Sequence, residues 1–169
     1  MNIKTKVCIL RNRLCYDRAS NITVKGNSMF PLIKSGEKVR LVEKKDYRIG
    51  DIVVFYYSET EKLVVHRVVL KYGGNLYCKG DNSFALEKIS ESDIIGCVTH
   101  IKKGDDLILV PKATKEFIAR SLQVNLVYCQ LNCNKDKVME TDIYRNYKKQ
   151  YLDSEKYCDK AAVPCEADI

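Results

Sequence analysis

From about residue 22 to residue 110, the chain consists of short runs of apolar, β-branched and aromatic residues, and apolar and polar positions alternate most clearly around His66. Runs of this length and composition, bounded by turn signals, predict β-strands. Glycine-containing turns separate the runs, and Gly73-Gly74 supplies the positive φ angles of a tight hairpin. The predicted strands are 22–25, 38–43, 52–57, 63–71, 76–79, 94–102 and 107–110.

The two ends of the chain have a helical period instead. Val7, Leu10 and Leu14 predict a short amphipathic helix over 5–18, and a broad apolar face predicts a helix over 113–131. We expect a second C-terminal helix from about 138 to 157 and a tail over 161–169. The fold class predicted is mainly β, a folded sheet or partly open barrel with a helical extension. The expected organisation is an N-terminal helix (1–20), a β-rich domain (21–111) and a helical C-terminal extension (112–169).

Composition describes an ordinary globular protein of 169 residues, with 46% hydrophobic and 30% charged residues. A net charge of +7 suits an acidic peptide, anionic lipid or nucleic acid, although a solvated lysine-rich surface is the commoner cause. The longest apolar runs, 52–57 and 63–70, are far shorter than the ~20 residues that cross a bilayer. We therefore expect a cytoplasmic protein without a transmembrane segment, whose eight cysteines are reduced and mostly buried.

Three short motifs bring together the residue types of an acyl-transfer site. A serine stands in a turn, a histidine in a strand and an aspartate in a loop; the motifs are Gly26-Asn27-Ser28-Met29-Phe30-Pro31, Val65-His66-Arg67-Val68 and Gly80-Asp81-Asn82. Their order and wording resemble the catalytic core of the S24/S26 serine peptidase superfamily, which includes signal peptidase I and LexA-like peptidases. The resemblance also takes in Gly50-Asp51-Ile52-Val53 and Ile95-Gly96-Cys97-Val98, and so covers roughly residues 20 to 110. His66 points to the subgroup that pairs serine with histidine rather than with lysine.

The resemblance implies a role for each of the three polar residues. Ser28 is the nucleophile, and a serine hydroxyl needs a neighbouring base to take its proton. The family places its general base at His66, and an imidazole can accept a proton near neutral pH. Asp81 is the first candidate for orienting His66; the alternative is a turn aspartate that caps local amides. The serine–histidine signal peptidases carry a second acidic residue a little further on, which makes Glu87 a secondary candidate.

The serine turn itself is expected to serve the substrate. The resemblance assigns the oxyanion site to the backbone of Gly26, Asn27 and Ser28, with Gly26 standing where many bacterial signal peptidases have a hydroxyl. Met29 and Pro31 are the candidates for the apolar floor beneath the substrate, and Pro31 also fixes the exit from the turn.

Alternation along the predicted strand 63–71 separates its two faces. Val64, His66 and Val68 share one face, and Arg67 belongs to the other. We expect Arg67 to be structural and to pair with a carboxylate of a neighbouring loop.

The sequence thus favours a serine endopeptidase that cleaves a peptide or a leader or precursor segment through an acyl-enzyme on Ser28, with His66 as base. We expect no metal and no cofactor, a peptide or protein substrate, and no nucleic-acid partner. A self-cleaving LexA-like regulator is disfavoured, because 27 residues before Ser28 are too few for a DNA-binding domain and contain no Ala-Gly or Cys-Gly bond. A non-catalytic peptide- or protein-binding module is the alternative. Peripheral membrane contact and a partner protein at the C-terminal helices stay open.

Overall fold

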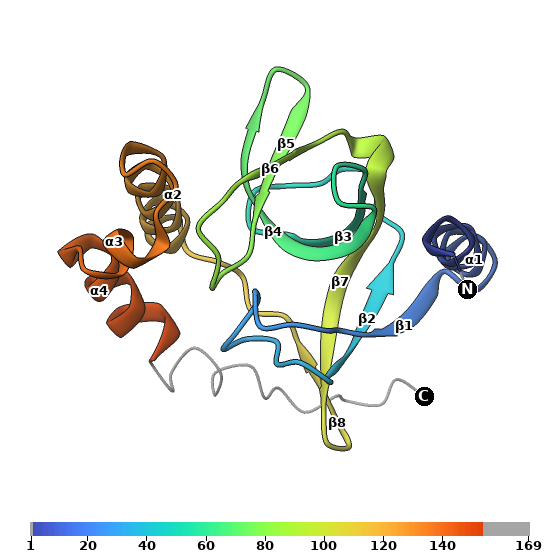
Figure 1. Ribbon diagram of the computed structural model, residues 1–169. Helices are drawn as coiled ribbons and strands as arrows, with labels where there is room; N and C mark the ends of the chain where they lie inside the picture. The colour runs from blue at the N-terminus through green and yellow to red at the C-terminus, as the bar shows by residue number, and fades with distance from the viewer. Residues whose placement is uncertain (1, 154–169) are drawn as a thin grey trace.

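The computed structural model describes residues 2–153 and contains one antiparallel sheet that curls into a half-barrel (Figure 1). One helix lies on one side of the sheet and the C-terminal helices lie on the other. The mainly β fold with a helical extension is therefore confirmed. The strands are β1 (Ala19–Thr23), β2 (Lys38–Val42), β3 (Ile52–Tyr57), β4 (Lys62–Tyr72), β5 (Asn75–Lys79), β6 (Glu87–Ile89), β7 (Ile94–Lys103) and β8 (Asp106–Leu109).

The strand order is β1-β2-β7-β3-β4-β5-β6, and β8 pairs with β7. β3 to β6 follow one another as a meander, in which short turns join β3 to β4 and β4 to β5, and the loop 80–86 joins β5 to β6. The β4–β5 turn holds Gly73 at φ 57° and Gly74 at φ 75°, as expected for a tight hairpin. Two expectations need correction: β1 begins and ends before the predicted 22–25, and β6 was not predicted, because three residues are too few to show alternation.

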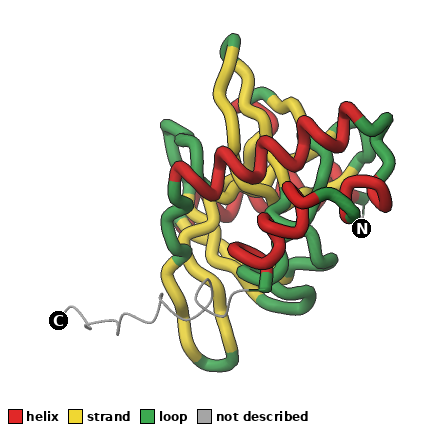
Figure 2. The backbone as a smooth tube through the Cα atoms, turned by 90° about the vertical axis from the view of Figure 1, so that its left-hand side faces the viewer, coloured by secondary structure: helices red, strands yellow, loops and turns green. Residues whose placement is uncertain are grey.

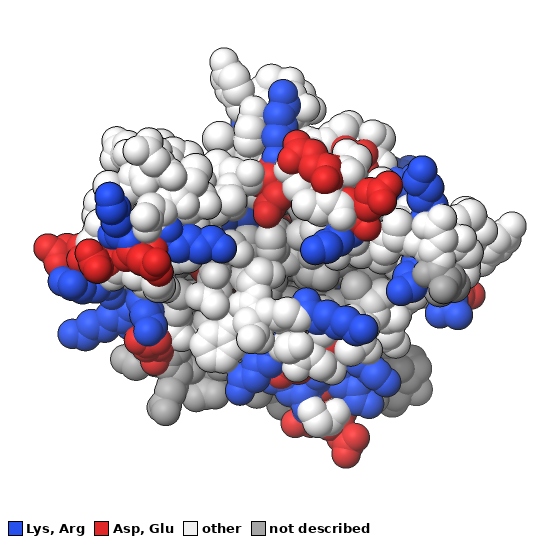
Figure 3. Space-filling model, viewed as in Figure 1, with Lys and Arg blue, Asp and Glu red and all other residues white. Residues whose placement is uncertain are grey.

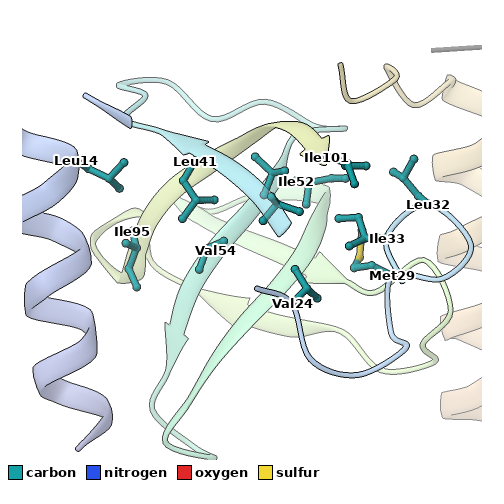
Figure 4. Packing of buried hydrophobic residues seen from close by; sticks show 12 residues of the cluster. Leu14, Val24, Met29, Leu32, Ile33, Leu41, Ile52, Val54, Ile95 and Ile101 are labelled. Carbon is teal, nitrogen blue, oxygen red and sulfur yellow. The ribbon is translucent and has the colours of Figure 1, made fainter. Parts of the chain in front are cut away.

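Helix α1 (Ile3–Asp17) begins after Asn2, whose side chain accepts a hydrogen bond from the Lys4 N–H and caps the helix. Leu14 is the one buried residue of α1 and enters the core between the curled faces of the sheet (Figure 4). Val7 and Leu10 pack partly against the same cluster. These are the three apolar positions that predicted the helix.

The C-terminal helices are α2 (Lys115–Gln130), α3 (Lys135–Met139), α4 (Asp142–Tyr147) and the single π-helical turn η2 (Lys148–Leu152). The single helix expected from about 138 is wrong for the described residues. α3 ends at Met139, and a new helix begins after Thr141. The Thr141 hydroxyl caps α4 by accepting a hydrogen bond from the Tyr144 N–H. The end of that expected helix and the expected tail lie outside the described residues.

In Figure 2, the longest helix crosses in front of the strands, and this helix is α2. The helices pack through their own apolar cluster, which includes Phe117, Val124 and Tyr147 and joins the sheet at Val69 of β4. The outer face of β4 is thereby covered by the extension.

The cysteines depart from expectation. Cys78 and Cys97 are buried, but the other four described thiols are exposed: Cys8, Cys15, Cys129 and Cys133. All six are free thiols.

Candidate active site

Ser28 lies in a turn that follows β1 and is half-buried. Gly26 has a φ of 92°, which favours glycine, and its N–H donates to Ser35 Oγ at 3.2 Å. The Asn27 carbonyl accepts from the Phe30 N–H at 3.1 Å. The Gly26 N–H is therefore already bonded to Ser35, which corrects its assignment to the oxyanion site. The Asn27 and Ser28 N–H groups donate no hydrogen bond to a described residue, so these two donors of the predicted oxyanion site remain.

Ser28, His66 and Glu87 all line one groove of about 950 Å³. His66 lies on β4 with 6% of its surface exposed, and its Nδ1 is 2.8 Å from Glu87 Oε2. No hydrogen bond joins Ser28 Oγ to His66 among the described residues, and such contacts commonly tighten when substrate binds. The structure thus brings the serine, the histidine and one carboxylate to a single cavity.

Gly80 lets the serine turn and the histidine ring come close together. A Cβ at this position would lie 2.6 Å from Ser28 O and 2.8 Å from His66 Nε2. It would also lie 2.6 Å from Ser83 Oγ, so this hydroxyl, which the sequence reasoning missed, borders the same point. Only glycine fits here, because such distances are shorter than van der Waals contact.

Asn82 joins the loop to the serine turn through two hydrogen bonds. The Asn82 N–H donates to Ser28 O at 2.7 Å, and Asn82 Nδ2 donates to Asn27 O at 3.2 Å. The Gly80-Asp81-Asn82 motif therefore positions the serine through its backbone and its asparagine.

Asp81 does not orient His66, which corrects the first candidate. Its carboxylate receives two hydrogen bonds from Arg67, from Nε to Oδ1 at 2.9 Å and from Nη2 to Oδ2 at 2.7 Å. Both side chains are buried, with 0% and 1% exposed. His66 and Arg67 are consecutive strand residues and point to opposite faces, so a carboxylate bound by Arg67 is on the wrong side for the imidazole. The expected pairing of Arg67 with a loop carboxylate is confirmed.

Glu87 occupies the place that we assigned to Asp81. In the sheet, Cys78 of β5 pairs with Val68 of β4 on one side and with Glu87 of β6 on the other. Val68 shares a strand face with His66, so Glu87 lies on the same face of the sheet as His66. A carboxylate at Nδ1 holds the proton on that nitrogen and leaves Nε2 as the acceptor. Nε2 is the nitrogen that faces Gly80 and the serine turn.

Met29 and Pro31 do not form the substrate floor. Met29 is 1% exposed and packs in the core beside Ile33 (Figure 4), and Pro31 is also buried. Neither residue lines the groove. The turn directs Met29 down between the faces of the curled sheet, where its thioether fills the core. The apolar lining comes from β4 and from the segment that leaves β1 instead, and it includes Val24, Leu63 and Val65.

Residues 8–99 match the protein-family model described as Peptidase S24-like, and this is 92 of the 169 residues. The chain belongs to the Peptidase S24-like family. A search of curated proteins finds no significant match. The family region contains Ser28, His66, Asp81 and Glu87, and it ends within β7.

Two further features concern the described residues alone. No helix among residues 2–153 is long and apolar enough to cross a membrane. Within the same residues, no group of three histidine, cysteine, aspartate or glutamate side chains is placed to hold a metal ion.

Outside the S24-like region, α2 and α4 support the loop that follows β5. Tyr147 donates its hydroxyl to Asp81 O at 2.6 Å, and Asn125 Nδ2 donates to Phe84 O at 2.8 Å. The Phe117 ring lies 5.3 Å from the Arg67 guanidinium carbon, within cation–π distance. The sequence signal for these contacts was a polar pair, Ser121 and Asn125, that shares a helix face with Phe117.

Lys79 is completely buried beneath these helices. Its Nζ donates to Ser121 Oγ at 3.0 Å and to Gly80 O at 3.3 Å, and it lies 5.4 Å from the Tyr147 ring centroid. Burial lowers the pKa of Lys79 to about 8, although Asp81 and Glu87 favour its charged form. A titratable amine therefore lies at the junction of the extension and the active-site loop.

This burial predicts a specific pH dependence of stability. Because the pKa of Lys79 is about 8 in the folded protein and 10.5 ordinarily, unfolding takes up a proton between these values. The free energy of unfolding of the wild type should therefore gain about 3 kcal/mol from this group as pH rises from 8 to 10.5. Lys79→Met should lack that gain, as measured by urea unfolding at pH 7.5 and pH 10. Lys88→Met, at an exposed lysine of β6, should keep the wild-type dependence. An unchanged dependence in Lys79→Met would show that this amine is not desolvated.

Proposed function

We propose that this chain is a serine endopeptidase that cleaves a peptide or a leader or precursor segment through an acyl-enzyme on Ser28. The observation that supports this most is the His66–Glu87 hydrogen bond of 2.8 Å in a groove that Ser28 also lines. Membership of the Peptidase S24-like family supports the same class of chemistry.

The proposed reaction starts when Ser28 Oγ attacks the peptide carbonyl carbon while His66 Nε2 takes the hydroxyl proton. Glu87 accepts the Nδ1–H and stabilises the imidazolium that forms. The Ser28 N–H donates to the oxyanion of the tetrahedral intermediate. As the C–N bond breaks, His66 returns its proton to the leaving amine. Water then attacks the ester, with His66 as base again, and releases the acid and free Ser28.

The groove suits an extended peptide rather than a small molecule. It runs along the residues that end β1 and along β4, where Ile22, Val24, Leu63 and Val65 present apolar side chains. A peptide laid beside a strand gains backbone hydrogen bonds, while pockets for alternate side chains select sequence.

A non-catalytic peptide-binding module is the second candidate. It is favoured by the lack of a Ser28–His66 hydrogen bond and by the use of the Gly26 N–H within the turn. Loss of one oxyanion donor typically costs about 10²–10³ in turnover.

Covalent labelling separates the two candidates. Wild-type protein should react with a fluorophosphonate at Ser28, identified by peptide mass, and should cleave apolar peptides. Ser28→Ala should abolish both, and His66→Ala should slow both by at least about 10³-fold, because the base is lost. Ser58→Ala, at an exposed turn serine, is the matched control and should match wild type. Peptide binding by a folded wild-type protein that neither labels nor cleaves would support the module.

Gly80→Ala tests whether the close approach of the serine turn and His66 is needed. The added methyl would overlap Ser28 O and His66 Nε2, so the turn must move away from the ring. We expect labelling of Ser28 to slow by about 10²-fold, the loss typical of a misplacement of about 1 Å. Gly104→Ala adds a methyl with no atom within 4 Å and strains only the β7–β8 turn, where Gly104 has a φ of 62°, so it should leave the labelling rate unchanged. Wild-type reactivity in Gly80→Ala would contradict this role.

A further inference from the structure

We propose that the groove selects peptides with apolar residues at the cleavage site and acidic residues further along the peptide, and that basic side chains of α1 bind the acidic residues. This inference rests on the proposed function, because it names the substrate class of the same groove.

One wall of the groove is formed by a single face of α1. The lining residues of the helix are Ile3, Lys6, Ile9, Leu10 and Arg13. Their spacing of three or four residues is that of one helix face. The wall is preformed, because Leu14 anchors the helix in the core and Arg11 Nη2 donates to Ser92 O at 2.6 Å.

The charge of the lining is strongly one-sided. Its basic residues are Lys6, Arg13, Lys25 and Lys62, and all four are exposed. None of them forms an ion pair with another residue of the described part of the chain. The one acidic lining residue is Glu87, which is bonded to His66. The cations are therefore available to an acidic ligand.

The arrangement in space agrees with this division of roles. In Figure 3, lysine and arginine side chains gather around the hollow between the sheet and α1, and acidic side chains collect above it. Glu59 and Glu61 of the β3–β4 turn do not line the groove. A ligand that extends from Ser28 meets the apolar strand residues and then the basic helix.

Helix geometry sets the spacing of the acidic residues. Lys6 and Arg13 are seven positions apart, which is about 10 Å along a helix that rises about 1.5 Å per residue. An extended peptide rises about 3.3 Å per residue, so this distance corresponds to about three peptide residues. Two acidic side chains two to four positions apart can reach both cations.

An anionic lipid surface would also attract these cations. The peptide is favoured because the basic side chains line the same cavity as Ser28 and His66, so a peptide bound at Ser28 would contact them. The lipid becomes an outcome of the test.

The test uses two pools of quenched-fluorophore peptides with the same set of randomised apolar core sequences. The pools differ only at two positions away from the core, which are both Asp in one pool and both Lys in the other. Binding is measured on Ser28→Ala, and cleavage on the wild type. We expect at least tenfold tighter binding of the Asp peptides, expressed in KM rather than kcat, and a preference that shrinks as salt screens the charges. The Lys6→Glu variant should lose the preference for the Asp peptides. Lys4→Glu makes the same charge change on α1 outside the groove and should keep it.

The outcomes separate this inference from the proposed function. An Asp preference in binding without any cleavage supports the inference and overturns the peptidase. Equal binding of Asp and Lys peptides, or an Asp preference that Lys4→Glu removes as much as Lys6→Glu does, overturns the inference. Binding of phosphatidylglycerol vesicles that depends on Lys6, without a preference among peptides, would show that α1 binds lipid. This result also overturns the inference.

Discussion

The buried ion pair between Arg67 and Asp81 is the interaction on which the rest of the site depends. Arg67 follows His66 on β4, and Asp81 belongs to the loop that holds the serine turn. Two hydrogen bonds join the side chains, and Arg67 Nη1 donates a third to Gly50 O at 3.0 Å. Leaving one partner of such a pair buried alone costs about 3–5 kcal/mol. The strand that carries His66 and the loop that positions Ser28 are therefore fixed to each other.

The pair also divides the carboxylates between two faces of β4. Asp81 neutralises Arg67 on the face that α2 and α4 cover, while Glu87 bonds to His66 on the groove face. The helices contribute to this division, because Phe117 packs on the guanidinium and Tyr147 bonds to the Asp81 carbonyl. The extension outside the S24-like region thus supports the back of the loop 80–86.

Much of this could be predicted from the sequence, because strong local patterns encode it. Runs of β-branched and apolar residues predicted the long strands β3, β4 and β7, and the family motifs predicted Ser28 and His66 as candidate site residues. The choice between two carboxylates could not be predicted, since it depends on β6, whose three residues show no alternation, and on its register with β5. Met29 was misplaced because an apolar residue suits a core as well as a groove. The break at Thr141 was missed because the cap is a single hydroxyl within a helical pattern.

The most direct test of this account compares the two carboxamide variants, Asp81→Asn and Glu87→Gln, by unfolding free energy and by the rate of fluorophosphonate labelling at Ser28. The account predicts that Asp81→Asn lowers the unfolding free energy by about 3–5 kcal/mol, because it leaves the Arg67 charge buried without its counter-ion. Glu87→Gln should change stability by about 1 kcal/mol or less, since its side chain is partly exposed, and should slow labelling at least tenfold. Slow labelling in a fully stable Asp81→Asn, with wild-type labelling in Glu87→Gln, would contradict it.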